Sequence, residues 1–167
     1  MWISWDQLPP TSRIWIYSST TNLESVREEM SNRYIRPFCE SWKVHGQPLN
    51  SSFRWIDGYF LVLGVDETHQ PASGCSIDSS VALIRTLQEE YKVDLMNRLY
   101  VHVWHNSQKL EVLAPADVPH AISENRLSSD SLVYQTALTQ KSQLEHELLQ
   151  PAGSTWLQRH FKNAITL

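Results

Sequence analysis

The sequence predicts an α+β fold of the ferredoxin-like type, with two helices on one face of an antiparallel sheet in the order β-α-β-β-α-β. Three observations favour it: branched and aromatic runs typical of strands, two stretches with apolar residues at helical spacing, and the tight-turn signal Asp57-Gly58 between the two central runs. A chain of 167 residues fits one domain. We therefore expect a single domain over 1–167, with a core at about 13–113 and a helical C-terminal extension at about 114–167.

The chain is expected to begin with a strand and a long helix. Residues 13–18 are rich in branched and aromatic side chains, which predicts the first strand. Thr21-x-x-Glu24 has the form of a capping box and predicts a helix start. Apolar residues then recur at three- and four-residue steps and share one helix face; they are Leu23, Val26, Met30, Tyr34, Phe38 and Trp42. Pro37 is expected to kink or break this helix because it lacks a backbone N–H.

The middle of the chain supplies the rest of the predicted sheet. Residues 52–56 and 59–65 are expected to form a hairpin around Asp57-Gly58, and the second of these strands is apolar enough to be central. After a polar loop, apolar residues at helical spacing predict a second helix over about 78–91. Residues 99–105 then form the fourth strand.

The remaining sequence carries weaker signals. Residues 109–113 can pair with the fourth strand, and 115–125 has the pattern of a short helix. A further helix is expected over 138–149. Ser154 has the character of a cap for a last segment with apolar residues. These segments form the predicted helical extension.

Composition and motifs exclude several classes of function. A net charge of −4 lacks the basic footprint of non-specific nucleic-acid binding, and no apolar run is long enough to span a membrane. No signal peptide and no CxxC spacing occur, so we expect a cytoplasmic protein with free thiols. The GxxxxGKS/T, GxGxxG and HExxH motifs are absent. His102 and His105 are an odd number of residues apart on a strand and cannot easily share an ion, so no metal or cofactor is expected.

The main candidate site is the segment Ser73-Gly74-Cys75-Ser76-Ile77-Asp78, which precedes the second helix. Helix N-termini present free N–H groups and a partial positive charge, and small residues leave these groups accessible. The segment is then either an ordinary cap, with Ser76 or Asp78 as N-cap, or a seat for a small anionic ligand. The residues expected to bind that ligand are Ser73, Gly74, Ser76, Arg98 and Trp42.

Two other functions stay open from the sequence. In a thiol-dependent hydrolase or transferase, Cys75 is the nucleophile, His45 is its base, and Asp66 or Asp78 orients the imidazole. In an interaction module, two copies of the chain pair through open edge strands to form a homodimer. The leading hypothesis is the small-molecule or anion-binding protein.

Three segments together resemble a known protein family. They are Trp42-Lys43-Val44-His45-Gly46-Gln47-Pro48-Leu49, Ser73-Gly74-Cys75-Ser76-Ile77-Asp78 and Asp94-Leu95-Met96-Asn97-Arg98. The family consists of small uncharacterised bacterial proteins that often carry the label "ABC transporter ATPase". The resemblance covers nearly the whole chain and implies no activity, substrate or site residue. The residues contradict the label, because no Walker A loop is present to cradle nucleotide phosphates.

Overall fold

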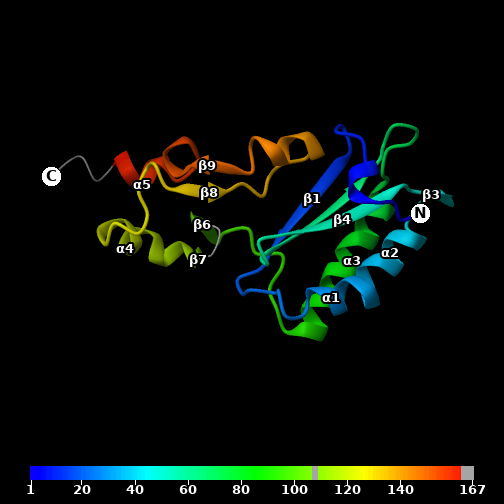
Figure 1. Cartoon of the computed structure of the whole chain (residues 1–167), viewed down its shortest axis with the longest axis horizontal. Coiled ribbons are helices and arrows are strands. Elements are labelled where there is room, and N and C mark those ends of the chain that lie inside the picture. The colour runs from blue at the N-terminus through cyan, green and yellow to red at the C-terminus, as the bar shows by residue number, and fades with distance from the viewer. Residues whose placement is uncertain (107–108, 163–167) are drawn as a thin grey trace. The chain divides into compact units, whose positions relative to one another are not determined.

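The computed structural model describes residues 1–106 and 109–162, and shows a mixed helix and strand protein with antiparallel sheets (Figure 1). These residues divide into two compact units. Unit 1 contains Met1–Asn97 and Thr136–Leu144, and unit 2 contains Arg98–Gln135 and the described residues from Glu145 onward. The boundary between these units, at residues 97 and 98, lies inside the segment of about 13–113 that was expected to form one core.

Unit 1 is built on a three-stranded antiparallel sheet in the order β1-β5-β4. Its strands are β1 (Arg13–Ser18), β4 (Ser51–Ile56) and β5 (Phe60–Val65), close to the predicted ranges. Asp57 and Gly58 both have positive φ, at 49° and 71°, which the tight turn between β4 and β5 requires. The predicted hairpin and the central place of β5 are confirmed.

The first predicted helix is present, but it contains a π-helical segment. It consists of α1 (Arg27–Met30), the π-helix η2 (Ser31–Ile35) and α2 (Arg36–Ser41). Pro37 has no N–H to offer the carbonyl of Arg33, four residues earlier, which accounts for a widened turn just before it. The proline therefore interrupts the α-helical pattern without ending the helix.

Both predicted helix starts are wrong by several residues. The Thr21-x-x-Glu24 segment is not a capping box, because α1 begins only at Arg27. Just after Thr21, the N–H of Leu23 donates to the carbonyl of Gly58 at 2.7 Å, and this tie to the hairpin holds the chain in a turn. The second helix, α3 (Gly74–Tyr91), begins four residues earlier than expected.

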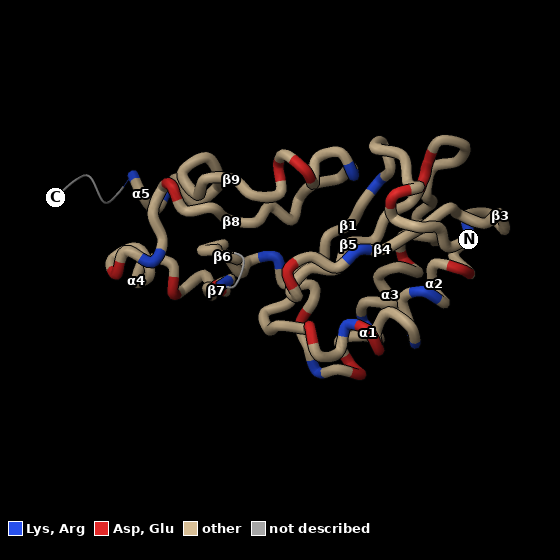
Figure 2. Tube along the Cα trace, viewed as in Figure 1, with Lys and Arg blue, Asp and Glu red and all other residues tan. Residues whose placement is uncertain are grey.

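The three helices α1, α2 and α3 pack on one face of the sheet, as predicted (Figures 1 and 2). Their buried residues form one cluster with the inward side chains of β5; its members include Met30, Ile35, Cys39, Leu61, Leu63, Ile84 and Leu87. The solvent side of α1 carries mixed charges, and Arg33 lies 3.5 Å from Glu29 and 3.7 Å from Glu90. Exposed pairs of this kind add little stability, so apolar burial holds this layer.

The opposite face of the sheet is also covered, unlike the single helical layer that was predicted. Every residue of β5 is buried. On Gly64, a Cβ atom would meet a Leu8 methyl carbon at 2.8 Å and the Trp5 ring at 3.1 Å. The short helix η1 (Trp5–Gln7) and Leu8 therefore pack directly against the backbone of β5. Glycine is needed here because a side chain would occupy the same space.

Both outer strands of this sheet already have backbone partners over part of their length. The N–H of Ile14 donates to the carbonyl of Thr139, and the N–H of Ile3 donates to the carbonyl of Ser51, each at 2.9 Å. The helix predicted over 138–149 is wrong, because the first residues of this segment bond to the edge of β1. Helical structure in it is limited to the 3₁₀ turn η4 (Lys141–Glu145).

Unit 2 is built on a second antiparallel sheet, in the order β7-β6-β8-β9. Its strands are β6 (Val101–Asn106), β7 (Lys109–Leu113), β8 (Leu132–Tyr134) and β9 (Leu149–Pro151). The predicted pairing of 109–113 with the fourth strand is confirmed. Residues 107 and 108, between these strands, lie outside the described residues.

Short helices complete unit 2. They are η3 (Pro115–Asp117), α4 (Val118–Ser123), η5 (Ala152–Ser154) and α5 (Gln158–Lys162). Their apolar residues form one buried cluster with the sheet, whose members include Val101, Val103, Val118, Ala121, Leu127, Val133 and Leu157. The helix expected over 115–125 is confirmed in this form.

The ferredoxin-like sheet is the main fold prediction that needs correction. The fourth strand, β6, pairs with β7 and β8 and not with any strand of the first sheet. Its buried side chains, Val101 and Val103, pack on residues that follow in the sequence, which gives β6 an apolar partner surface of its own. The predicted helical extension likewise contains β8 and β9. The general class, α+β with antiparallel sheets, is correct.

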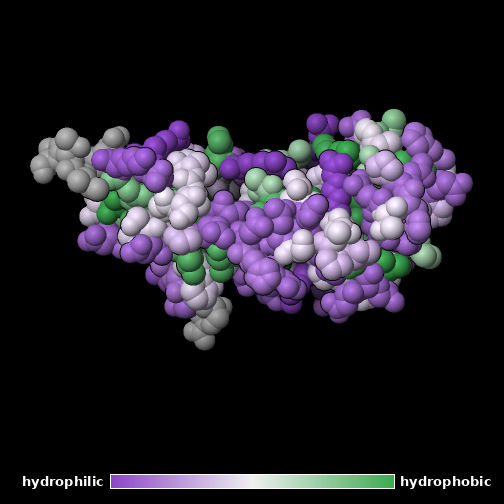
Figure 3. All heavy atoms as spheres, turned by 90° about the horizontal axis from the view of Figure 1, so that it is seen from above, coloured by the Kyte–Doolittle hydropathy of each residue, from purple (hydrophilic) through white to green (hydrophobic). Residues whose placement is uncertain are grey.

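The surface visible in Figure 3 is mainly hydrophilic, with apolar atoms in small separate groups. Within the described residues, we find no helix that combines the length and the apolar character needed to cross a membrane.

Candidate functional site

The predicted loop site forms the first turn of α3. Ser73 is the N-cap, and its hydroxyl accepts a hydrogen bond from the N–H of Ser76 at 3.3 Å. The N-cap was expected at Ser76 or Asp78 and lies three to five residues earlier, at Ser73. Gly74 and Cys75 are exposed, and their N–H groups have no acceptor among the described residues. A helix N-terminus of this kind attracts anions in general, but no further group here selects one.

Trp42 is joined to this turn, although not as a ligand-binding residue. Its indole Nε1 donates to the carbonyl of Ser76 at 2.9 Å, and its side chain is buried. The ring centroids of Phe38 and Trp15 lie 4.7 and 5.8 Å away. The structure therefore brings two of the proposed ligand-binding residues, Trp42 and Ser76, together through a buried hydrogen bond, and the ring of Trp42 belongs to the hydrophobic core.

The proposed catalytic residues are not joined to one another. His45 lies at the tip of the hairpin between β2 (Lys43–Val44) and β3 (Gln47–Pro48), where it has a φ of 47°. The side chains of Cys75, His45 and Asp78 are exposed, and none of the hydrogen bonds or ion pairs among described residues links them. Asp66 bonds instead to Thr68, and the Thr68 hydroxyl lowers the pKa of this carboxyl group.

We expect the two cysteines to differ sharply in reactivity. Burial raises the pKa of the Cys39 thiol to about 12, whereas Cys75 is exposed. One thiol of the native protein should react promptly with a disulfide reagent at pH 8, and two after denaturation. The Cys75→Ser variant should show no prompt reaction; prompt reaction in that variant would contradict the burial of Cys39. The same reagent tests the nucleophile hypothesis, because an apparent pKa of Cys75 at or above about 8.5 argues against an activated thiolate.

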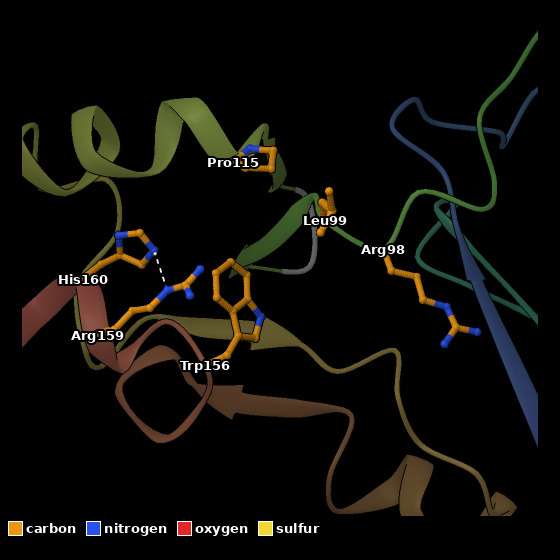
Figure 4. Close-up of a pocket in the computed structure, with 6 residues that line it drawn as sticks. All are labelled: Arg98, Leu99, Pro115, Trp156, Arg159 and His160. Carbon is orange, nitrogen blue, oxygen red and sulfur yellow. Dashed lines mark hydrogen bonds between the residues drawn. The ribbon is translucent and has the colours of Figure 1, made fainter.

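Arg98, the remaining predicted ligand-binding residue, belongs to unit 2. There it lines a cavity of about 370 Å³, together with Leu99, Pro115, Trp156, Arg159 and His160 (Figure 4). Leu99 and Trp156 are large apolar side chains with 67% and 50% of their surface exposed. Exposed apolar side chains that gather in one concave site are typical of ligand pockets.

One side of this cavity is formed by Arg159 and His160, two consecutive residues of α5. The guanidinium carbon of Arg159 lies 5.1 Å from the ring centroid of Trp156, a cation–π contact. Its Nε donates to Nε2 of His160 at 3.4 Å, and the rings of His160 and Trp156 meet edge to face at 6.0 Å. Figure 4 shows Arg159 between the two rings, whereas the guanidinium group of Arg98 points away from them.

The charges around the cavity are unbalanced. Two arginines and a histidine line it, and no aspartate or glutamate is among its described lining residues. Several other arginines have a carboxylate partner within 4 Å; they are Arg13, Arg27, Arg33 and Arg126. Arg98 and Arg159 make no ion pair with a described acidic residue. Within residues 1–106 and 109–162, the cavity therefore presents a positive charge without a carboxylate partner beside an apolar wall.

Sequence reasoning did not identify Trp156, Arg159 and His160 as site residues. It expected only a last segment with apolar residues and assigned no role to these three side chains. The signal available was the short spacing Trp156-x-x-Arg159-His160, which puts an indole ring close to a guanidinium group and an imidazole in the sequence. Such a spacing is common and gains meaning only when the residues line a cavity.

No resident metal site is indicated, since no group of three potential metal ligands occurs among residues 1–106 and 109–162. Comparison with families of known proteins, with curated sequences and with solved structures finds no significant match to this chain. The fold and the cavity together describe an α+β protein with a small cationic and aromatic pocket. The family resemblance stays a prediction.

Proposed function

We propose that this protein binds a small organic anion in the cavity of unit 2, and that Arg159 is the principal anion-binding residue. The single observation that carries the proposal is a guanidinium group that has no ion-pair partner among the described residues and lies beside half-exposed Trp156, in a cavity whose described lining contains no acidic residue. The proposal keeps the predicted ligand class and moves the site from the N-terminus of α3 to α5.

The chemistry of the lining residues supports an anion over a neutral ligand. A guanidinium group offers a planar fork of N–H donors that matches a carboxylate or phosphate. The indole ring beside Arg159 limits the access of water to one side of the guanidinium group, which strengthens its electrostatic interactions. An anionic ligand would also neutralise a charge that no described side chain compensates.

The proposal is tested with 2-naphthoate and its neutral carboxamide, titrated calorimetrically into the purified protein. The acid should bind more tightly than the amide, and Arg159→Gln should weaken binding of the acid by about tenfold, because one charge-assisted hydrogen bond is lost. Rising ionic strength should weaken the binding of the acid but not the binding of the amide.

Arg85→Gln is the matched control. Arg85 is exposed on α3, has no ion pair among the described acidic residues, and its replacement changes the net charge by the same amount. We expect this variant to bind 2-naphthoate like the unmodified protein. Equal affinities for acid and amide, or equal losses in the two variants, would contradict the proposal.

A further inference from the structure

We infer that the ligand of this cavity is a planar aromatic monocarboxylate, with its ring stacked on Trp156 and its carboxylate held by the guanidinium group of Arg159. The inference rests on the proposed function and narrows it to one chemical class. It follows from three features of the cavity: its size, the number of cationic groups that converge in it, and the shape of its apolar walls.

The size of the cavity limits the ligand to about one or two rings. Its volume of about 370 Å³ is near the lower end of the range for small-molecule sites, roughly 300–1,000 Å³. A dinucleotide or a long acyl chain would extend well beyond it. A compact body with one polar group fits this space.

The cationic groups favour a single anionic group. Nε2 of His160 accepts the hydrogen bond from Nε of Arg159 at 3.4 Å, which leaves the terminal N–H groups of this guanidinium for one carboxylate. Arg98 extends away from Arg159 in Figure 4 and adds no second cation at the same point. A phosphate monoester carries up to two charges near neutral pH and is usually held by several donors and cations. A monocarboxylate matches one guanidinium fork.

The apolar walls favour a flat ring over a bulky saturated one. Arg159 covers one side of the Trp156 indole, and half of the surface of this residue remains exposed. Leu99 and Pro115 supply further apolar lining. An aromatic ring can stack in an offset manner on the indole, and this contact adds binding free energy beyond that of burying its apolar area. A saturated ring of the same size contributes only the free energy of burial.

The test adds decahydro-2-naphthoate, which has the skeleton and charge of 2-naphthoate but no planar ring. We expect the unmodified protein to bind the planar acid about fivefold more tightly than the saturated acid, as the range of stacking energies implies. In Trp156→Leu the planar acid should lose this advantage, and the two acids should bind within about twofold of each other. The affinity of the saturated acid for this variant measures the loss that both acids share, because the indole also contacts Arg159.

The outcomes separate the inference from the proposed function. If both acids bind equally well and better than 2-naphthamide, the ring preference is wrong and anion binding stands. If Trp156→Leu keeps the preference for the planar acid, the assignment of the stacking residue is wrong. If the charge of the ligand has no effect, or no probe binds, the proposed function fails and the inference fails with it. Trp156 is half exposed, so the variant should fold, and its circular dichroism and thermal midpoint provide the check.

Discussion

Replacement of Trp42 by alanine is expected to lower the free energy of unfolding by about 3–5 kcal/mol, the usual cost of removing a buried aromatic side chain. Trp42 is 2% exposed and packs against Phe38 and Trp15. It also donates from Nε1 to the carbonyl of Ser76 and so joins the end of α2 to the first turn of α3. Guanidinium denaturation followed by circular dichroism measures the change.

Two further variants separate the contributions at this position. Trp42→Phe keeps a ring in the cluster but removes the hydrogen bond to Ser76, and should cost about 1–3 kcal/mol. Trp156→Ala makes the same chemical change as Trp42→Ala at a half-exposed side chain and should cost about 1 kcal/mol or less. Similar losses for the two alanine variants would contradict the assignment of Trp42 to the core and of Trp156 to an open cavity.

Replacement of Gly64 by valine should lower the free energy of unfolding by about 2–3 kcal/mol. A Cβ atom at this position meets Leu8 at 2.8 Å and the ring of Trp5 at 3.1 Å, and valine adds two more carbons. The tip of Leu8 can move to accept a single carbon, so Gly64→Ala should cost less. The cost of Gly64→Val should also shrink in a Leu8→Ala background, because neighbouring residues do not contribute additively.

Gly74→Ala is the control for this prediction. A Cβ atom on Gly74 meets nothing within 4 Å, and the residue opens α3 without a positive φ. The change should therefore leave stability unaltered or raise it by up to about 1 kcal/mol, because alanine restricts the unfolded chain. If Gly64→Val is as harmless as Gly74→Ala, η1 and Leu8 do not pack on β5 as described.

Local patterns were read correctly wherever the physical cause is itself local. The strand at 13–18 and the hairpin at Asp57-Gly58 follow from side-chain shape and from the backbone freedom of glycine. The interruption near Pro37 follows from its missing N–H. The start of α3 was expected four residues too late, and its cap was misplaced, because several serines there can each accept the same kind of bond.

The candidate site was less predictable than the strands and helices. Trp42 was expected to bind a ligand, yet its ring is part of the core, and sequence alone does not show which of seven tryptophans remain accessible. Arg98 was expected to bind an anion near the start of α3; it lines the cavity of unit 2, and its side chain points away from Trp156, Arg159 and His160. Trp156, Arg159 and His160 were overlooked because their spacing has no meaning until a cavity surrounds them.

The sequence by itself determined the α+β class, the central place of 60–65 and the positions of most strands and helices, since these depend on periodicity and turn chemistry. Only the tertiary structure decided that β6 joins a second sheet with β7 and β8, and that 139–141 bonds to the edge of β1 and does not form an α-helix. Pairing between distant strands depends on which apolar faces pack against each other, and this cannot be deduced from local sequence patterns. The cavity also depends on the tertiary structure, because its lining residues come from three separate segments, at 98–99, 115 and 156–160.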